Sequence, residues 1–145
     1  MKKIKKLISI LLCFMIIAAL VPALNFKASA TTTIHSGSYY CLRNRSSGYY
    51  LDVTGNTTYN GTNIEQFQHG NYPSERWQII SQGNGYYKLR TSLIDSPQMV
   101  IDGRSFCAPG VQLILFESGA YTEQEWYFEK QSNGTYKLRL LRDNL

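Results

Sequence analysis

The sequence contains few of the residues on which most enzymatic chemistry depends. Among its 145 residues are two histidines and three cysteines. His35 and His69 lie far apart in the chain, and neither belongs to a metal-binding or nucleophile motif. There is also no glycine loop of the kind that binds phosphate. These absences argue against catalysis, so we expect no catalytic residue, no metal and no cofactor.

Positive charge is concentrated at the N-terminus. Four of the first six residues are lysines, an uncharged apolar run follows over residues 7–24, and the small residues Ala28-Ser29-Ala30 come next. This order is typical of a secretory signal peptide, so we expect residues 1–30 to be removed and the protein to be secreted. The alternative is a membrane anchor, because such a run can just span a bilayer. Pro22 and the Ala-x-Ala site favour cleavage.

Little net charge remains once residues 1–30 are set aside. Five lysines leave with this segment, and ten basic residues then face ten acidic ones. The formal net charge falls from +5 to zero and no run of Lys or Arg remains, so a nucleic-acid partner has no electrostatic basis. We also expect no attachment to a membrane after cleavage.

Residues 31–145 are rich in aromatic side chains, with 17 in all, of which 11 are tyrosines. This composition excludes disorder, and Tyr and Trp favour β-strands and polar-faced binding surfaces. Two cysteines, Cys41 and Cys107, remain after cleavage. They either pair with each other or stay as two buried free thiols, and two cysteines do not make a disulfide framework.

A repeat of about 49 residues organises this part of the chain. Tyr-Tyr-Cys-Leu-Arg at 39–43 recurs as Tyr-Tyr-Lys-Leu-Arg at 86–90 and as Thr-Tyr-Lys-Leu-Arg at 135–139. Other residues keep nearly the same offset, namely the pairs Asp52 and Asp102, Gly61 and Gly110, Phe67 and Phe116, and Trp77 and Trp126. Because different residue types hold one spacing, we infer tandem copies of one structural unit.

Each unit is predicted to contain four short strands separated by turn clusters such as Asn60-Gly61 and Asn84-Gly85. The expected strands are 40–42, 50–53, 64–68 and 77–80 in the first unit and 87–89, 99–102, 113–116 and 126–128 in the second. No segment of residues 31–145 has helical periodicity. The fold class is therefore all-β, and four strands in a unit of this length are the pattern of a β-trefoil.

The sequence resembles the ricin B-chain-like, or R-type, lectin domains of secreted bacterial proteins. The matching residues of the first copy are Leu51-Asp52-Val53-x-Gly55, Asn60-Gly61-Thr62-Asn63-Ile64-x-Gln66-Phe67 and Glu75-x-Trp77. The second copy has Gln124-Glu125-Trp126, the QxW motif of the family, whereas the first has Glu75 in place of the Gln. The likeness covers about residues 37–145 and implies a non-catalytic, sugar-binding β-trefoil.

The family has three repeats around a pseudo-threefold axis, whereas the third repeat here begins at residue 136 and reaches only Leu145. We therefore expect an incomplete trefoil lectin domain over residues 31–145, with two full repeats and the first strand of a third. The favoured interpretation is that the chain is a fragment of a longer lectin. The alternative is that a partner chain completes the barrel, since an open trefoil exposes strand edges and core aromatics.

The resemblance also implies sugar-binding residues. In the family, an Asp after the second strand accepts bonds from sugar hydroxyls, an aromatic residue of the third strand stacks on the ring, and polar residues before the QxW Trp complete the pocket. By position, the expected carbohydrate-binding residues are Asp52, Glu65, Phe67, Ser74 and Glu75 in the first repeat and Asp102, Phe116 and Gln124 in the second. Ile114 and Glu123 occupy the remaining positions. Since Ile114 cannot form a hydrogen bond, the second site is expected to be weaker.

Other roles remain open for these residues. Each Asp can instead cap the turn after its strand through backbone N–H groups. Trp77 and Trp126 are expected in the core, because the family buries that Trp. His69 and Tyr72 are alternative stacking residues, or simply surface aromatics.

We expect a lectin module that binds glycans weakly at shallow pockets and gains affinity through multivalency. The alternative is a sugar-inactive trefoil that docks a secreted enzyme or toxin, because amides common in the family are absent at Glu65 and Ser74. Glycoside hydrolysis by Asp52, Glu65 and Glu75 is a third hypothesis, but the shallow surface of a trefoil lacks the cleft that this chemistry needs.

Overall fold

The computed structural model describes residues 33–104 and 110–141. The chain divides into two units, residues 1–30 and 31–145, and every described residue belongs to the second. The expected signal peptide and Cys107 therefore lie outside the described residues. In the described part, no helix has the length and apolarity needed to cross a membrane.

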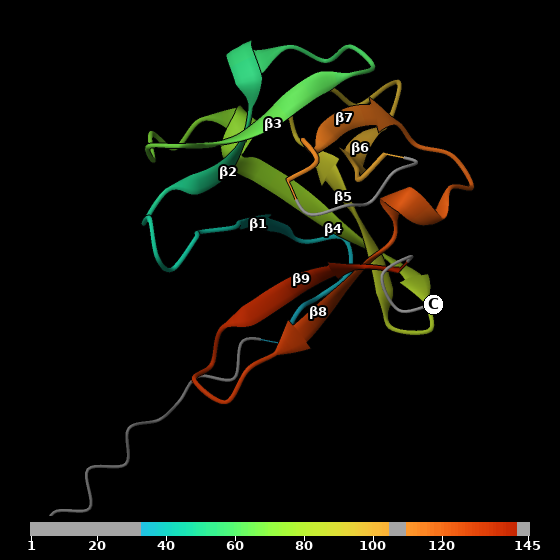
Figure 1. The fold of residues 1–145 in the computed structure, drawn as a ribbon. Coiled ribbons are helices and arrows are strands. Elements are labelled where there is room, and N and C mark those ends of the chain that lie inside the picture. Colours follow the sequence, from blue (N-terminus) through green and yellow to red (C-terminus); the bar gives the residue numbers. More distant parts are fainter. Residues whose placement is uncertain (1–32, 105–109, 142–145) are drawn as a thin grey trace, which may run out of the picture. The chain divides into compact units, whose positions relative to one another are not determined.

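The described residues form nine strands and three short 3-10 helices joined by turns and loops, so the all-β class is confirmed (Figure 1). In chain order the elements are β1 (Tyr39–Cys41), β2 (Tyr50–Val53), η1 (Thr54–Asn56), β3 (Thr62–Phe67), η2 (Pro73–Glu75), β4 (Arg76–Gly83), β5 (Tyr86–Thr91), β6 (Met99–Asp102), β7 (Ile114–Glu117), η3 (Thr122–Gln124), β8 (Trp126–Lys130) and β9 (Tyr136–Leu140). All eight strands expected in the two full units are present. The ends of several differ from the prediction, and β4 extends furthest beyond its predicted end. β9 is the strand that opens the third repeat.

The strands pair antiparallel throughout, and hairpins connect them both within and between the repeats. β2 pairs with β3 and β6 with β7 inside each repeat, while β4 pairs with β5 and β8 with β9 across the repeat boundaries. β5 also pairs with β6 and β8 of its own repeat, so its pairing with β4 joins the two repeats. β1 pairs with β4 at the end of the strand order. Cys41 lies on this terminal strand and is an exposed free thiol, so the expectation of a buried thiol was wrong for Cys41.

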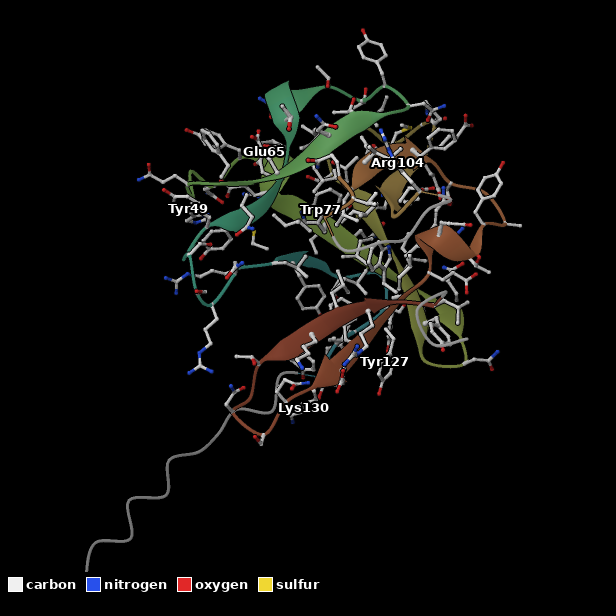
Figure 2. All side chains as sticks on the ribbon, in the orientation of Figure 1. Tyr49, Glu65, Trp77, Arg104, Tyr127 and Lys130 are labelled. Carbon is white, nitrogen blue, oxygen red and sulfur yellow. The ribbon has the colours of Figure 1, made fainter. Side chains whose placement is uncertain are left out.

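Both tryptophans lie in the core, as predicted. Trp77 is fully buried and Trp126 nearly so, and they share one cluster with Leu89, Ile101 and Leu115. Figure 2 shows Trp77 among the crowded side chains between the strands.

The two indoles make equivalent hydrogen bonds. Nε1 of Trp77 donates to the carbonyl oxygen of Leu51 at 3.0 Å, and Nε1 of Trp126 donates to that of Ile101 at 3.1 Å. In each repeat this bond ties the fourth strand to the residue that precedes the aspartate of the second strand. The burial of Trp therefore also positions the aspartate.

We expect Trp77→Phe to lower the free energy of unfolding by about 2–4 kcal/mol, because the carbonyl of Leu51 loses its donor and a cavity is left in the core. Urea denaturation followed by circular dichroism measures the change. Tyr59→Phe is the control, since the side chain of Tyr59 is 76% exposed and its substitution should leave the stability unchanged. Equal stability of all three chains would contradict the role given to Trp77.

Candidate functional site

The β2–β3 hairpin gathers four side chains on one of its faces. In its register, Tyr50 lies opposite Phe67 and Asp52 lies opposite Glu65. Alternate residues of a strand share a face, so these four residues lie together, and Val53 is buried in the core on the other face. The hairpin thus brings together three residues that the sequence assigns to one sugar site, which are Asp52, Glu65 and Phe67.

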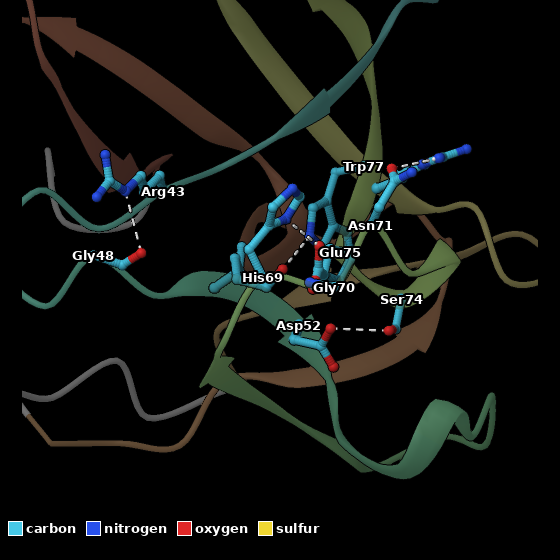
Figure 3. Close-up of polar contacts among 11 residues, drawn as sticks. Arg43, Gly48, Asp52, His69, Gly70, Asn71, Ser74, Glu75 and Trp77 are labelled. Carbon is cyan, nitrogen blue, oxygen red and sulfur yellow. Dashed lines mark hydrogen bonds and ion pairs between the residues drawn. The ribbon is translucent and has the colours of Figure 1, made fainter.

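Asp52 is a largely buried carboxylate with an incomplete set of protein partners. Its Oδ2 accepts a hydrogen bond from the hydroxyl of Ser74 at 2.9 Å, and Ser74 is its one hydrogen-bond partner among the described residues (Figure 3). In the same part of the chain, the one buried polar side-chain atom without a partner is Nε of Arg90. Oδ1 of Asp52 thus has no protein partner in that part of the chain and is not fully enclosed, although Asp52 as a whole is only 5% exposed, so this oxygen can accept a hydrogen bond from a ligand hydroxyl.

Burial raises the pKa of the Asp52 carboxyl above its ordinary value. The hydrogen bond from Ser74 opposes this rise, whereas the charges of Glu75 and Glu65 add to it. Because the pKa is higher in the folded state than in the unfolded state, ionisation of Asp52 costs stability, and the cost grows as the pH rises through the folded pKa. A carboxylate kept at such a cost is typical of a functional position.

Glu75, at the Gln position of the QxW motif, is completely buried. Its Oε1 accepts the backbone N–H of Gly70 at 2.8 Å, and its Oε2 lies 2.7 Å from Nδ1 of His69 (Figure 3). The ring of His69 stacks on Tyr50, with 4.4 Å between the ring centroids. Both carboxylate oxygens of Glu75 thus bind groups of the loop between β3 and η2. One of these groups is the ring of His69, which is held against Tyr50.

The aspartate of the second repeat has different hydrogen-bond partners. Gln124 is completely buried, its Nε2 donates to Oδ2 of Asp102 at 3.0 Å, and its Oε1 accepts the N–H of Gly119 at 2.9 Å. Oδ1 of Asp102 accepts the N–H of Arg104 at 2.7 Å, which is the turn-capping geometry. Across the β6–β7 hairpin, Asp102 lies opposite the buried Ile114. Both oxygens of Asp102 therefore have protein partners, and its cross-strand neighbour cannot bind a hydroxyl.

A glycine and a tyrosine outside the motifs named above shape the loop before each Glu or Gln. A Cβ atom added to Gly70 would lie 1.9 Å from the ring of Tyr72, and one added to Gly119 would lie 2.3 Å from the ring of Tyr121. Only glycine leaves room for the ring, and the N–H of the same glycine binds Glu75 or Gln124. The pattern Gly-x-Tyr-x-x-Glu/Gln recurs at the repeat offset and is the sequence signal for this loop.

The aromatic residues of the two repeats differ in exposure. Phe67 is 50% exposed, whereas Phe116 is partly buried. Beside the first hairpin lies a shallow hollow of about 530 Å³, whose lining includes Arg43, Tyr49, Tyr50 and His69. The Tyr50–His69 stack is shared between this hollow and the surroundings of Asp52.

The first repeat therefore gathers a carboxylate oxygen without a protein donor in the described residues, further polar groups and several aromatic planes. Such groups suit a ligand that has both hydroxyls and an apolar C–H face. No group of three or more His, Cys, Asp or Glu side chains in the described ranges is placed to hold a metal ion. The fold and this set of groups are those of a lectin-like β-trefoil.

The chain belongs to the family of ricin-type β-trefoil lectin domain-like proteins, whose model matches residues 25–116. Comparison with curated proteins finds no match. Solved structures with similar folds confirm the β-trefoil. They include the designed threefold-symmetric protein ThreeFoil, with 28% identity, a TM-score of 0.66 and coverage of 70% of this chain and 71% of that one.

Two larger proteins contain a similar domain. An exo-β-1,3-galactanase from Clostridium thermocellum is 27% identical, with a TM-score of 0.66, over 74% of this chain and 23% of that one. A mosquitocidal holotoxin is 20% identical, with a TM-score of 0.65, over 75% of this chain and 13% of that one. The chain thus spans less than a quarter of the length of either protein, and the likeness to the toxin shows the fold alone.

We expect Glu75→Gln and Glu75→Ala to differ in stability. The Gln variant keeps an acceptor for the N–H of Gly70 and gains the donor that Gln124 uses toward Asp102, so its free energy of unfolding should stay within about 1 kcal/mol of the parent value. The Ala variant leaves the N–H of Gly70 unpaired and should lose about 1–3 kcal/mol. Urea denaturation of both variants measures this, and a Gln variant as unstable as the Ala variant would contradict the assigned role.

Proposed function

We propose that the protein is a secreted, non-catalytic carbohydrate-binding module that binds glycans through a shallow site at Asp52. The observation that carries the proposal is the state of this carboxylate. It is buried at a cost to stability and has Ser74 as its one hydrogen-bond partner in the described residues, so Oδ1 has no protein donor there. A sugar hydroxyl is the type of donor that this oxygen lacks.

Each residue near Asp52 has a distinct role in the proposed site. Ser74 orients the carboxylate, and Glu65 on the opposite strand is a second acceptor. Phe67, half exposed, provides a plane for the C–H face of the sugar ring. Glu75 is a positioning residue, because its oxygens bind His69 and Gly70 and none is left for a ligand.

The site of the second repeat is proposed to be the weaker of the two. Both oxygens of Asp102 are occupied, Gln124 is buried behind them, and Ile114 replaces the acceptor opposite. Phe116 is less exposed than Phe67. Useful affinity would then come from several modules binding together, or from a trefoil completed by a further segment or a partner chain.

Galactose and β-1,3-linked galactan oligosaccharides are the first glycans to test. The reason is the 27% identity to a domain-sized part of an exo-β-1,3-galactanase. A broad glycan array extends the search to other sugars.

A second candidate function is protein docking, favoured by an apolar hollow of about 580 Å³ in the described residues. It lies between β1 and the β8–β9 hairpin, and its lining includes Tyr40, Leu42, Ile79, Phe128 and Tyr136. A folded sample that binds no glycan on the array would favour this function over the first.

We expect Asp52→Asn to abolish or strongly weaken glycan binding while the free energy of unfolding at pH 7 is retained or increased. The variant keeps the shape of the side chain and removes the charge whose burial costs stability. Calorimetric titration with the glycan selected on the array and urea denaturation measure the two effects. Asp102→Asn is the matched control and should change binding much less. Unchanged binding by the Asp52 variant would show that the site is assigned wrongly.

On acidification, glycan binding should weaken at a higher pH than it would if Asp52 had the ordinary pKa of an aspartate. Protonation removes the negative charge and turns one carboxylate oxygen into a donor, and burial raises the pKa of Asp52, so binding is expected to fall at a higher pH than the ordinary pKa of Asp. Titrations between pH 7 and pH 4, with circular dichroism to verify folding, measure this effect. Binding that stays constant to pH 4 in a folded sample would contradict the role of the ionised carboxylate.

A further inference from the structure

The outer face of the β8–β9 hairpin carries polar and aromatic groups far in sequence from Asp52. Trp126 and Phe128 of β8 pack inward, Phe128 against Tyr87, whereas Tyr127 and Glu129 alternate with them and lie on the opposite face. Pairing of Tyr87 with Trp126 brings the start of β5 beside β8. The β8–β9 pairing brings Arg139, from the start of the third repeat, to the same face, so residues of two repeats meet there.

A hollow of about 560 Å³ lies there, and its lining residues are Asn84, Tyr86, Tyr127, Glu129 and Arg139. Asn84 is in the turn between β4 and β5, and Tyr86 is the first residue of β5. The rings of Tyr86 and Tyr127 lie 6.3 Å apart and are inclined by 56°. Tyr127 is 42% exposed (Figure 2), so the hollow has an aromatic wall open to solvent.

Charged groups form the other side of the hollow. Arg139 lies opposite Tyr127 in the β8–β9 register, and its guanidinium forms an ion pair with Glu129. The hydrogen bond from Arg139 lowers the pKa of the Glu129 carboxyl, so this carboxyl is ionised at neutral pH. A carboxylate and a guanidinium side by side provide an acceptor and donors for two neighbouring hydroxyls.

The equivalent place in the first repeat is built differently. At the repeat offsets, Gln78 corresponds to Tyr127, Ile80 to Glu129 and Arg90 to Arg139. There NH2 of Arg90 donates to the hydroxyl of Tyr39 at 3.2 Å, and the amide of Gln78 donates to a backbone carbonyl at 2.8 Å. The same strand position thus tolerates Gln and Ile, and the fold itself does not require Tyr127 and Glu129.

We propose that this hollow is a second carbohydrate site, in which a pyranose ring lies against Tyr127 while its hydroxyls bind the Glu129–Arg139 pair and the amide of Asn84. The class of ligand rests on the proposed function, since it assumes that the module binds glycans. The site itself uses no residue of the Asp52 site. Two sites on different faces of one chain would allow it to bind one polysaccharide at two points.

The experiment compares three forms of the purified chain, labelled with ¹⁵N: the parent, Asp52→Asn, and Tyr127→Gln combined with Glu129→Ile. The double variant takes the residues of the first repeat, so it is expected to fold, and an amide spectrum with the dispersion of the parent verifies this. Each form is titrated with galactose, glucose, mannose and N-acetylglucosamine while the shifts of the backbone amide of Tyr127 and the side-chain amide of Asn84 are followed.

At least one sugar should shift these signals in the parent and in Asp52→Asn, with roughly tenfold weaker binding in the double variant. Shifts around Asp52 should persist in the double variant. Response at Tyr127 without any response around Asp52 would overturn the site of the proposed function and leave this inference standing. Response around Asp52 alone, an equal response at the backbone amide of residue 127 and the side-chain amide of Asn84 in the double variant, or no response in any form would overturn this inference.

Discussion

The hydrogen bond from each tryptophan indole to the second strand is the contact on which the rest of the structure depends. Trp77 and Trp126 fill the core, and their N–H groups bind the carbonyls of Leu51 and Ile101, the residues directly before the two aspartates. A single side chain in each repeat thus contributes to hydrophobic burial and fixes the point at which the chain carries its carboxylate. The core and the candidate site are therefore coupled.

The buried aspartates of the two repeats differ in their hydrogen bonding. In the second, Gln124 and the N–H of Arg104 bind both oxygens of Asp102, which stabilises the turn and gives each oxygen a protein donor. In the first, Glu75 has no N–H to donate, so Ser74 binds one oxygen of Asp52 and His69 binds Glu75 instead. The change from Gln to Glu, which in the sequence is only a departure from the motif, accompanies an aspartate with one protein hydrogen bond in place of two.

Much of the fold could be predicted from the sequence, because the repeat offset, the alternation of apolar residues and the turn clusters are local or periodic signals. They predicted the all-β class and eight strands, while the resemblance to the R-type lectin family implied the burial of both tryptophans. The candidate site could be predicted less well from the sequence. Nothing in the motif shows that Glu75 and Gln124 turn their polar atoms inward, or that Gly70 and Gly119 receive a tyrosine ring. These features depend on the path of a loop, which the side chains packed around it decide.

By itself the sequence determined the repeated unit, its strands and the order of residues that identifies the family, since each of these depends on spacing along the chain. Only the tertiary structure decided which polar atoms remain available. Asp52 and Ser74 are 22 residues apart and form a hydrogen bond, and Asn84 and Arg139, further apart still, line one hollow. Burial and hydrogen bonding between such distant residues set the charge and exposure of a group, and spacing along the chain carries no record of either.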